Sequence, residues 1–308
     1  MGEVVEGLAY WTRWQVVACA LIIVITMAMS VSVILRTKKN GSVIDTDTWT
    51  TCWKTVHPLW LLFFRVLSLS VLFLVFYEVV LMVGTLSFYF YTQWTLMLVI
   101  FYFLIATFMS VHGCWVNSKI YTSANGGALI ENNNKIFEVK SYADQEQFAT
   151  CDGFCSTVMH VIYQTSAAAS ILTDIAFWGV LVPFLPPEGF TMNLVMGSVH
   201  SLNIIFLLID TVLNNMSFPW FRISYFLLWS GIYVNFLWIL NACGLSWWPY
   251  PFLELSIPWS PLCYLSMALF HVPCFAVYIW IVKAKTSYFP KWFPQGYISS
   301  SRNLANVS

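Results

Sequence analysis

Polar residues recur along one apolar stretch, 199–214, at a spacing that could line a buried site. The stretch is rich in Leu, Ile, Val and Phe, and it also carries His200, Asn203, Asp210, Thr211 and Asn214. Read as one helix at about 100° per residue, these five side chains fall within an arc of about 100°. An acidic side chain in hydrocarbon costs about 2.5–3.5 kcal/mol on insertion scales, so this face must point toward protein or a water-filled cavity. The pattern predicts the inner wall of a site in a helical bundle.

A threonine and a histidine among the apolar residues suggest nucleophilic chemistry. A threonine hydroxyl becomes a nucleophile when a base removes its proton, and histidine is the usual base near neutral pH. Thr92 is the candidate nucleophile, His200 the candidate base, and Glu78 could orient the imidazole as the third member of a triad. Asn203 or Asn235 could donate hydrogen bonds to an oxyanion. The other hydroxyl expected at this depth is that of Thr95.

Non-catalytic interpretations of the same residues stay open at this point. The Thr92 hydroxyl could cap its helix or bond back to the backbone, and His200 could make an interhelical hydrogen bond. Near the opposite face of the membrane, Arg65 and Asp210 are expected at similar depth, which predicts a structural ion pair. The alternative is that Arg65 extends to the lipid headgroups while Asp210 reaches water by itself.

The composition indicates that membrane-spanning helices must position these residues. The chain has 308 residues, of which 59% are hydrophobic and 9% charged, whereas soluble chains average about 25% charged residues. Since a helix of about 20 apolar residues crosses a bilayer, the apolar runs predict seven spans near 15–35, 59–83, 88–111, 156–185, 193–213, 221–243 and 260–283. The predicted fold is an all-α, polytopic membrane helical bundle with about seven transmembrane helices, a six-helix core plus an N-terminal anchor helix.

The predicted spans divide the chain into three parts. Residues 1–57 hold an N-terminal tail, the anchor helix and a cytosolic linker, residues 58–284 form the six-helix membrane core, and residues 285–308 form a cytosolic tail. The polar connection at 116–152 is predicted to be a flexible cytosolic loop.

Positive charges predict the orientation. Of the 14 Lys and Arg residues, Arg13 alone lies on the side opposite the others and Arg65 lies within a span, which indicates a luminal or extracellular N-terminus and a cytosolic C-terminus. The glycosylation sequons then fall on the cytosolic side and are expected to stay unused; they begin at Asn40, Asn215 and Asn306. We expect an integral protein of the endoplasmic reticulum or plasma membrane, in contact with membrane lipids. Nucleic acid is not an expected partner, since basic and acidic residues balance and no basic patch occurs.

Three blocks of sequence resemble one known family. The blocks at 90–95, 200–210 and 247–254 resemble the androgen-induced-protein / rolling-stone family of multi-pass membrane proteins. Their residues are most similar to those of its plant members. The likeness covers roughly 58–284.

The resemblance implies an intramembrane threonine hydrolase that cleaves fatty-acid esters with one Thr and one His. The histidine corresponds to His200. The threonine corresponds to Thr92, with Thr95 second, because alignment on Tyr91 shifts the register and places Gln93 at that position. A lipid ester is the implied substrate, no cofactor is expected, and the oligomeric state stays open.

Other functions compete with hydrolysis. A non-catalytic membrane scaffold is one, and a transporter of a small amphiphile is another, which would use Asp174 and His271 with Pro273 breaking its helix. Five His and Cys residues are expected near the cytosolic edge of the third and fourth spans: His112, Cys114, Cys151, Cys155 and His160. Their spacing is not a standard zinc pattern, so no metal site is predicted.

The aromatic block 247–252 has two interpretations. It is predicted to form an interfacial belt, since Trp and Tyr favour the membrane–water interface, with the alternative of a lid over the site. Cys243 and Cys263 flank it and could form a disulfide in an oxidising compartment.

Overall fold

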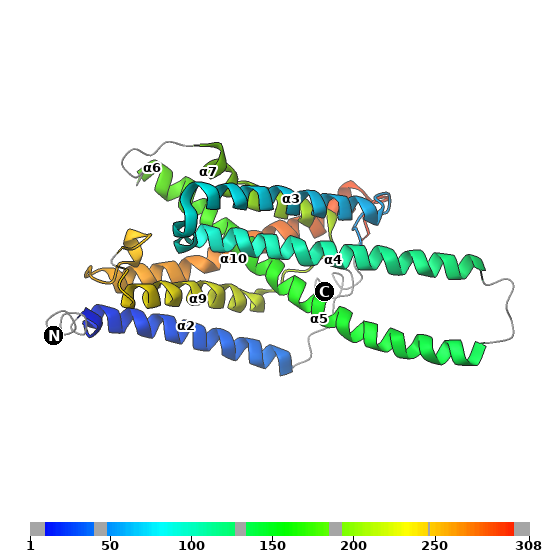
Figure 1. Ribbon diagram of the computed structural model, residues 1–308, viewed down its shortest axis with the longest axis horizontal. Helices are drawn as coiled ribbons and strands as arrows, with labels where there is room; N and C mark the ends of the chain where they lie inside the picture. Colours follow the sequence, from blue (N-terminus) through cyan, green and yellow to red (C-terminus); the bar gives the residue numbers. More distant parts are fainter. Residues whose placement is uncertain (1–9, 40–47, 127–133, 185–192, 246, 299–308) are drawn as a thin grey trace.

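The computed structural model describes residues 10–39, 48–126, 134–184, 193–245 and 247–298, without the side chains of 38–39 and 116–152. Every extended regular element in this part of the chain is a helix (Figure 1). The elements are α2 (Trp14–Lys39), α3 (Pro58–Val83), η1 (Gly84–Tyr89), α4 (Tyr91–Gly126), α5 (Asn134–Ala176), η2 (Phe177–Leu181), α6 (Val182–Phe184), α7 (Leu194–Val199), α8 (Leu202–Leu213), η3 (Trp220–Arg222), α9 (Ile223–Ala242), η4 (Pro251–Leu253) and α10 (Ser260–Trp292).

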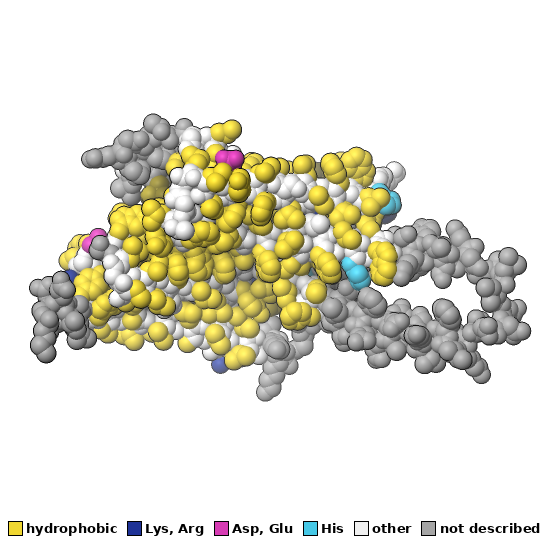
Figure 2. Space-filling model, in the orientation of Figure 1, with side chains coloured by type: hydrophobic (Ala, Val, Ile, Leu, Met, Phe, Trp, Pro, Cys, Tyr) yellow, Lys and Arg dark blue, Asp and Glu magenta, His cyan; other side chains and the backbone are white. Residues whose placement is uncertain are grey.

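Seven helical segments of the described chain are long and apolar enough to cross a membrane. They coincide with the seven runs expected from hydropathy, which confirms the all-α, seven-span prediction. Figure 2 shows the consequence on one face, where hydrophobic side chains form a nearly continuous cover over the middle of the bundle. Many large hydrophobic side chains of the described residues are exposed, including Trp60, Leu194 and Trp280. A water-soluble monomer rarely exposes so much apolar surface, so the chain is an integral membrane protein.

The helices pack as two neighbouring groups around α5 (Figure 1). α3 lies against α4, and α4 against α5, whereas α2 lies against α9 and α10. Close helix approach in membranes favours small residues, and Gly231 serves this purpose on α9: a Cβ there would lie 2.9 Å from Met27 Cγ of α2. The N-terminal span is therefore packed onto the bundle.

The long connection between the third and fourth spans differs from the prediction. Helix α4 continues to Gly126 and α5 begins at Asn134, so most of the expected flexible loop 116–152 is helical backbone that projects as a hairpin beyond the bundle (Figure 1). The polarity of this stretch was mistaken for absence of structure. It contains Ala, Glu, Lys and Gln, which are strong helix formers, and each half continues an existing helix without a new nucleation step.

The fifth span is also different, because it is not one helix. α7 ends at Val199 and α8 begins at Leu202, with His200 and Ser201 in the break. Of the five polar residues predicted to share one helical face, Asn203, Asp210 and Thr211 thus lie on α8, whereas His200 lies in the break before it and Asn214 directly follows it. By contrast, α10 continues through Pro273 from Ser260 to Trp292, so the expected break at this proline is wrong.

Candidate active site in a cavity at a broken helix

A cavity of about 330 Å³ lies at the end of the bundle where η1, η2 and α7 meet. Its walls come from α3, η1, α4, η2, α7 and the loop before η4, and most of the lining side chains are apolar. The polar lining residues are Ser87, Thr92, Gln93, Asn193, His200 and Tyr250. No charged side chain is found among the described lining residues. The cavity therefore suits an uncharged, largely apolar molecule with a few polar atoms.

The histidine owes its position to the break in the fifth span. His200 is the residue after the last turn of α7, with φ −99° and ψ 15°. Its carbonyl oxygen accepts a hydrogen bond from Trp178 Nε1 at 2.9 Å. Non-helical backbone at membrane depth persists where protein or a cavity satisfies its polar groups, and both conditions hold here. The break turns the imidazole toward the cavity wall.

A π-helical segment in the fourth span supports the same histidine. The segment runs from Phe177 to Leu181 and continues α5 directly into α6. The Phe177 ring stacks on the His200 ring at 3.7 Å between centroids, with 3° between the ring planes. π-Helical turns inside α-helices occur frequently at functional sites. Two irregular segments, one in each of two adjacent spans, thus border one cavity.

Thr92 lies in the first turn of α4 and meets the aromatic block. The backbone N–H of Tyr91 donates a hydrogen bond to the Tyr250 hydroxyl at 3.2 Å, and Thr92 and Tyr250 both line the cavity. Burial raises the pKa of Tyr250, and the hydrogen bond from Tyr91 partly opposes that rise. Tyr250 therefore remains a neutral phenol at physiological pH, able both to donate and to accept a hydrogen bond.

Sequence reasoning did not single out Tyr250 as a site residue. It was expected in an interfacial belt, with a lid as the alternative. Because Pro249 and Tyr250 both line the cavity, the block closes one side of it as a lid would. The feature of the sequence that could have indicated this position is the Tyr250 phenol between two prolines, Pro249 and Pro251, in the aromatic block.

Two buried polar atoms at the cavity, one on Gln93 next to Thr92 and one on His200 itself, lack a hydrogen-bond partner. Gln93, 3% exposed, has an unpaired Nε2, and His200, 9% exposed, has an unpaired Nδ1. A buried polar group without a hydrogen bond costs about 1–3 kcal/mol. Both residues line the cavity, so a bound molecule with polar atoms would relieve this cost.

The other predicted site residues lie elsewhere. Thr95 is buried and its hydroxyl donates to the Tyr91 carbonyl at 3.1 Å, the backbone-bonded alternative. Asn203 Nδ2 donates to the Val199 carbonyl at 3.0 Å, and exposed Asn235 donates to the Gly231 carbonyl at 2.7 Å. Glu78 is exposed and does not line the cavity, so it does not orient the imidazole. Of the six residues assigned to catalysis, the cavity brings together Thr92 and His200.

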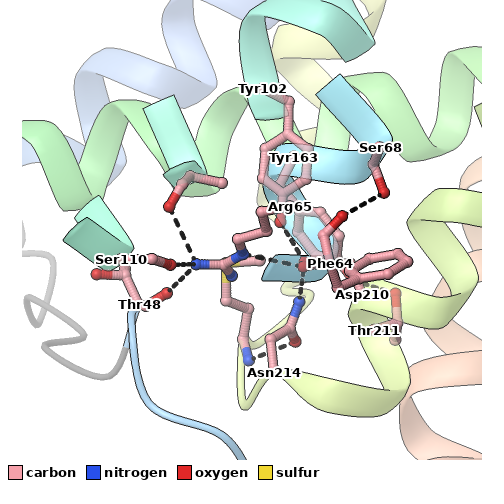
Figure 3. Close-up of polar contacts among 12 residues, drawn as sticks. Thr48, Phe64, Arg65, Ser68, Tyr102, Ser110, Tyr163, Asp210, Thr211 and Asn214 are labelled. Atoms are coloured by element: carbon pink, nitrogen blue, oxygen red, sulfur yellow. Dashed lines mark hydrogen bonds and ion pairs between the residues drawn. The ribbon is translucent and has the colours of Figure 1, made fainter. Parts of the chain in front are cut away.

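The predicted ion pair is present toward the start of α3, whereas the cavity lies at the end of that helix (Figure 3). Arg65 Nε lies 3.0 Å from Asp210 Oδ1, and both side chains are 0% exposed. The second carboxylate oxygen, Oδ2, accepts hydrogen bonds from the Tyr102 hydroxyl and, at 2.7 Å, from Asn214 Nδ2. The carboxylate of Asp210 is thus paired and hydrogen-bonded, as a buried charge requires.

Arg65 also joins three segments of backbone. Its Nη1 donates to the carbonyls of Thr48 at 3.0 Å and Ala106 at 3.2 Å, and to Ser110 Oγ at 2.7 Å. These contacts tie α3 to α4 and to the chain before α3 (Figure 3). Since Asp210 lies on α8, the pair ties the helix that starts beside His200 to α3.

The structure supplies no grouping for a metal site. Within the described residues, no three His, Cys, Asp or Glu side chains come together as metal ligands do; the side chain of Cys151 lies outside them. Cys243 and Cys263 are both free thiols, so the disulfide considered between them is not formed.

Comparisons with models of protein families, with curated proteins and with solved structures give no match to this chain. What can be said of this protein therefore depends on its structure. What they establish is a multi-pass helical membrane protein with a largely apolar, uncharged cavity at the break in its fifth span.

Proposed function

We propose that the cavity binds a neutral lipid ester and that Thr92 and His200 hydrolyse it. The observation that carries this proposal is that the two residues line one cavity, although 108 positions separate them in the chain. The surroundings favour an ester with a long acyl chain, since the walls are apolar and lack charge in their described part. The resemblance to the androgen-induced-protein / rolling-stone family, whose animal members use one Thr and one His on fatty-acid esters, supports the same chemistry.

The reaction has two steps. In the first, Thr92 Oγ1 attacks the ester carbonyl carbon, the imidazole of His200 takes the hydroxyl proton, and the same proton then passes to the departing alcohol. In the second, His200 removes a proton from water, the resulting hydroxide attacks the acyl-threonine carbonyl, and Thr92 Oγ1 recovers the proton as it leaves. The products are an alcohol and a free fatty acid.

Two donors on the cavity wall are suited to the oxyanion. The Tyr250 hydroxyl accepts a hydrogen bond from the backbone N–H of Tyr91, the residue before Thr92, and Gln93 Nε2 is a buried donor with no partner. Hydrogen-bond donors at a developing oxyanion are worth roughly 2.7–4 kcal/mol each when removed. We assign this role to Tyr250 and Gln93 in place of Asn203 and Asn235, whose amides already donate to the backbone carbonyls of Val199 and Gly231.

The orientation belongs to the same proposal. Nearly all Lys and Arg residues lie in the segments that follow the first, third, fifth and seventh spans. Because such segments stay in the cytosol, the cavity end faces the lumen or the extracellular space and the Arg65–Asp210 end faces the cytosol. Substrate then enters from the outer or luminal leaflet of the plasma membrane or endoplasmic reticulum. In membranes of defined sidedness, Asn215 stays unglycosylated if this orientation is correct.

Hydrolysis by purified protein in lipid nanodiscs tests the function. We expect release of fatty acid from long-chain esters, a loss of about 100-fold or more in Thr92→Ala and in His200→Ala, and substantial recovery in Thr92→Ser, which restores a hydroxyl. Thr95→Ser is the matched control, because Thr95 lies one turn further along α4 with its hydroxyl bonded to the backbone.

Unchanged hydrolysis in folded Thr92→Ala would contradict the assignment of the nucleophile. Absence of hydrolysis in the wild-type protein across acyl esters would favour a scaffold or a carrier of a small amphiphile. Tryptophan fluorescence and thermal unfolding of each variant show whether a loss of activity reflects loss of fold.

A further inference from the structure

A second hydroxyl–imidazole pair lies away from the large cavity. Ser230 Oγ of α9 lies 2.7 Å from Nε2 of His271 on α10. The Tyr91 hydroxyl of α4 lies 2.7 Å from the same Ser230 oxygen. On its other side, His271 Nδ1 lies 2.7 Å from the carbonyl oxygen of Met267. Three helices thus contribute one linear chain of hydrogen bonds.

The direction of each hydrogen bond follows from the last acceptor. A carbonyl oxygen only accepts, so Nδ1 of His271 carries a proton and donates it to Met267. In the neutral imidazole Nε2 is then the acceptor, and the Ser230 hydroxyl donates to it. Because the Ser230 proton is already engaged, the Tyr91 hydroxyl donates to Ser230 Oγ. The serine proton therefore points at a base whose tautomer is held by a third group, which is the general signature of an activated nucleophile.

Ser230 differs in this respect from four other hydroxyls in the described spans. The hydroxyls of Ser32, Ser68, Ser70 and Thr165 each donate to the carbonyl four residues earlier in their own helix. That local bond is the usual way for a membrane helix to satisfy a serine or threonine. Ser230 instead bonds across the helix interface to His271.

The pair opens on a cavity of its own. Ser230 and His271 both line a space of about 70 Å³ between α2, α9 and α10. A bound water needs roughly 10–15 Å³ by the same kind of measure, so the space holds a small acyl group or a few waters. The wall opposite the pair is formed by α2, with Thr26 and Met27. The N-terminal span therefore completes this site.

We propose that Ser230 and His271 form a second nucleophilic centre, which takes short-chain acyl esters. Ser230 Oγ attacks the ester carbonyl carbon while its proton moves to His271 Nε2, and this proton then leaves with the alcohol. Water next gives a proton to Nε2 and adds as hydroxide to the acyl-serine. Ser230 Oγ regains the proton as the short-chain acid departs. Tyr91 donates to the oxygens at this centre, and the Met267 carbonyl holds the imidazole.

The two cavities select different substrates by size. The larger one, about 330 Å³ beside Thr92, accommodates a long chain, whereas about 70 Å³ beside Ser230 does not. Tyr91 and Thr92 are consecutive residues, so the first turn of α4 separates the two sites. The second centre does not depend on Thr92 or His200, and its test can succeed or fail without them.

Covalent labelling of the full-length protein in nanodiscs tests the proposal. A fluorophosphonate with a short propargyl arm is added, and the modified peptide is identified by mass spectrometry. We expect an adduct on Ser230 that is retained in Thr92→Ala, absent in Ser230→Ala, and formed about 100-fold more slowly or worse in His271→Gln. A fluorophosphonate with a long alkyl chain should label Ser230 poorly.

Ser70→Ala is the matched control, since Ser70 is a membrane-helix serine whose hydroxyl bonds to its own helix; labelling should not change. The wild-type result decides the proposal even if a variant fails to fold. A short fluorophosphonate that leaves Ser230 unmodified in folded wild-type protein would overturn it, as would equal labelling rates in wild type and folded His271→Gln.

Discussion

Replacement of Asp210 by asparagine should uncouple the buried cluster while keeping its shape. The carboxylate neutralises Arg65 and accepts three hydrogen bonds, from Arg65, Tyr102 and Asn214. In Asp210→Asn one carboxylate oxygen becomes an NH₂ group that faces donors instead of accepting from them. Arg65, at 0% exposure, loses its counter-ion.

The expected cost follows from these contacts. Breaking a buried ion pair by removing one partner costs about 3–5 kcal/mol, because the remaining charge is left uncompensated. Hydrogen bonds to charged groups contribute about 1.5–3 kcal/mol each, so the loss of one or two at Asp210 agrees with that range. We therefore expect Asp210→Asn to lower the free energy of unfolding by about 3–5 kcal/mol.

A double-mutant cycle isolates the ion pair from the rest of the cluster. Arg65→Met removes the guanidinium and should also cost several kcal/mol, whereas the double variant has no buried charge left at this pair. Its loss should be smaller than the sum of the two single losses by about 2–3 kcal/mol. Unfolding by sodium dodecyl sulfate in mixed micelles, followed by tryptophan fluorescence, measures all four proteins.

Glu78→Gln is the matched control for charge removal within a span. Glu78 is exposed, so its neutralisation should not destabilise the protein. Effects of Asp210→Asn and Arg65→Met that simply add, to within about 0.5 kcal/mol, in the double variant would show that the two side chains are not coupled.

Three further substitutions test the packing and the broken helix. In Gly113→Ala the new Cβ would meet the Trp49 ring at 2.2 Å, which should cost about 1–3 kcal/mol of stability. In Gly179→Ala the nearest atom is 3.8 Å away on Ile175, so that variant should be neutral or up to about 1 kcal/mol more stable; equal thermal shifts in the two would contradict the close approach. Trp178→Phe removes the donor to the His200 carbonyl and should speed hydrogen exchange at 199–203, and unchanged exchange would show that this bond does not hold the break.

The seven spans were predictable because each depends on its own residues. A run of apolar side chains long enough for the bilayer must form a helix in lipid, where backbone groups can bond only to one another. The pairing of Arg65 with Asp210 was predictable for a related reason: each had to find a partner at its depth, and the depths matched. Thr92 and His200 were placed on one level by the same argument.

Other features depended on contacts between helices. The break at His200 has no proline to announce it, and the carbonyl it releases is satisfied by Trp178 from another span. Tyr250 acquires its place beside Thr92 from the fold of the loop before η4. Hydropathy likewise does not distinguish a polar helix from a polar loop, which is why the projecting ends of α4 and α5 were missed.

By itself, the sequence determined the class of protein and the number of crossings, because hydrophobicity and helical rise act locally along the chain. The tertiary structure alone decided which polar residues meet. It placed Thr92 with His200 at one cavity, sent Glu78 and Asn235 to exposed positions, and joined Ser230 to His271. Rotation of one helix against another sets these pairings, and that rotation comes from side-chain packing across the bundle.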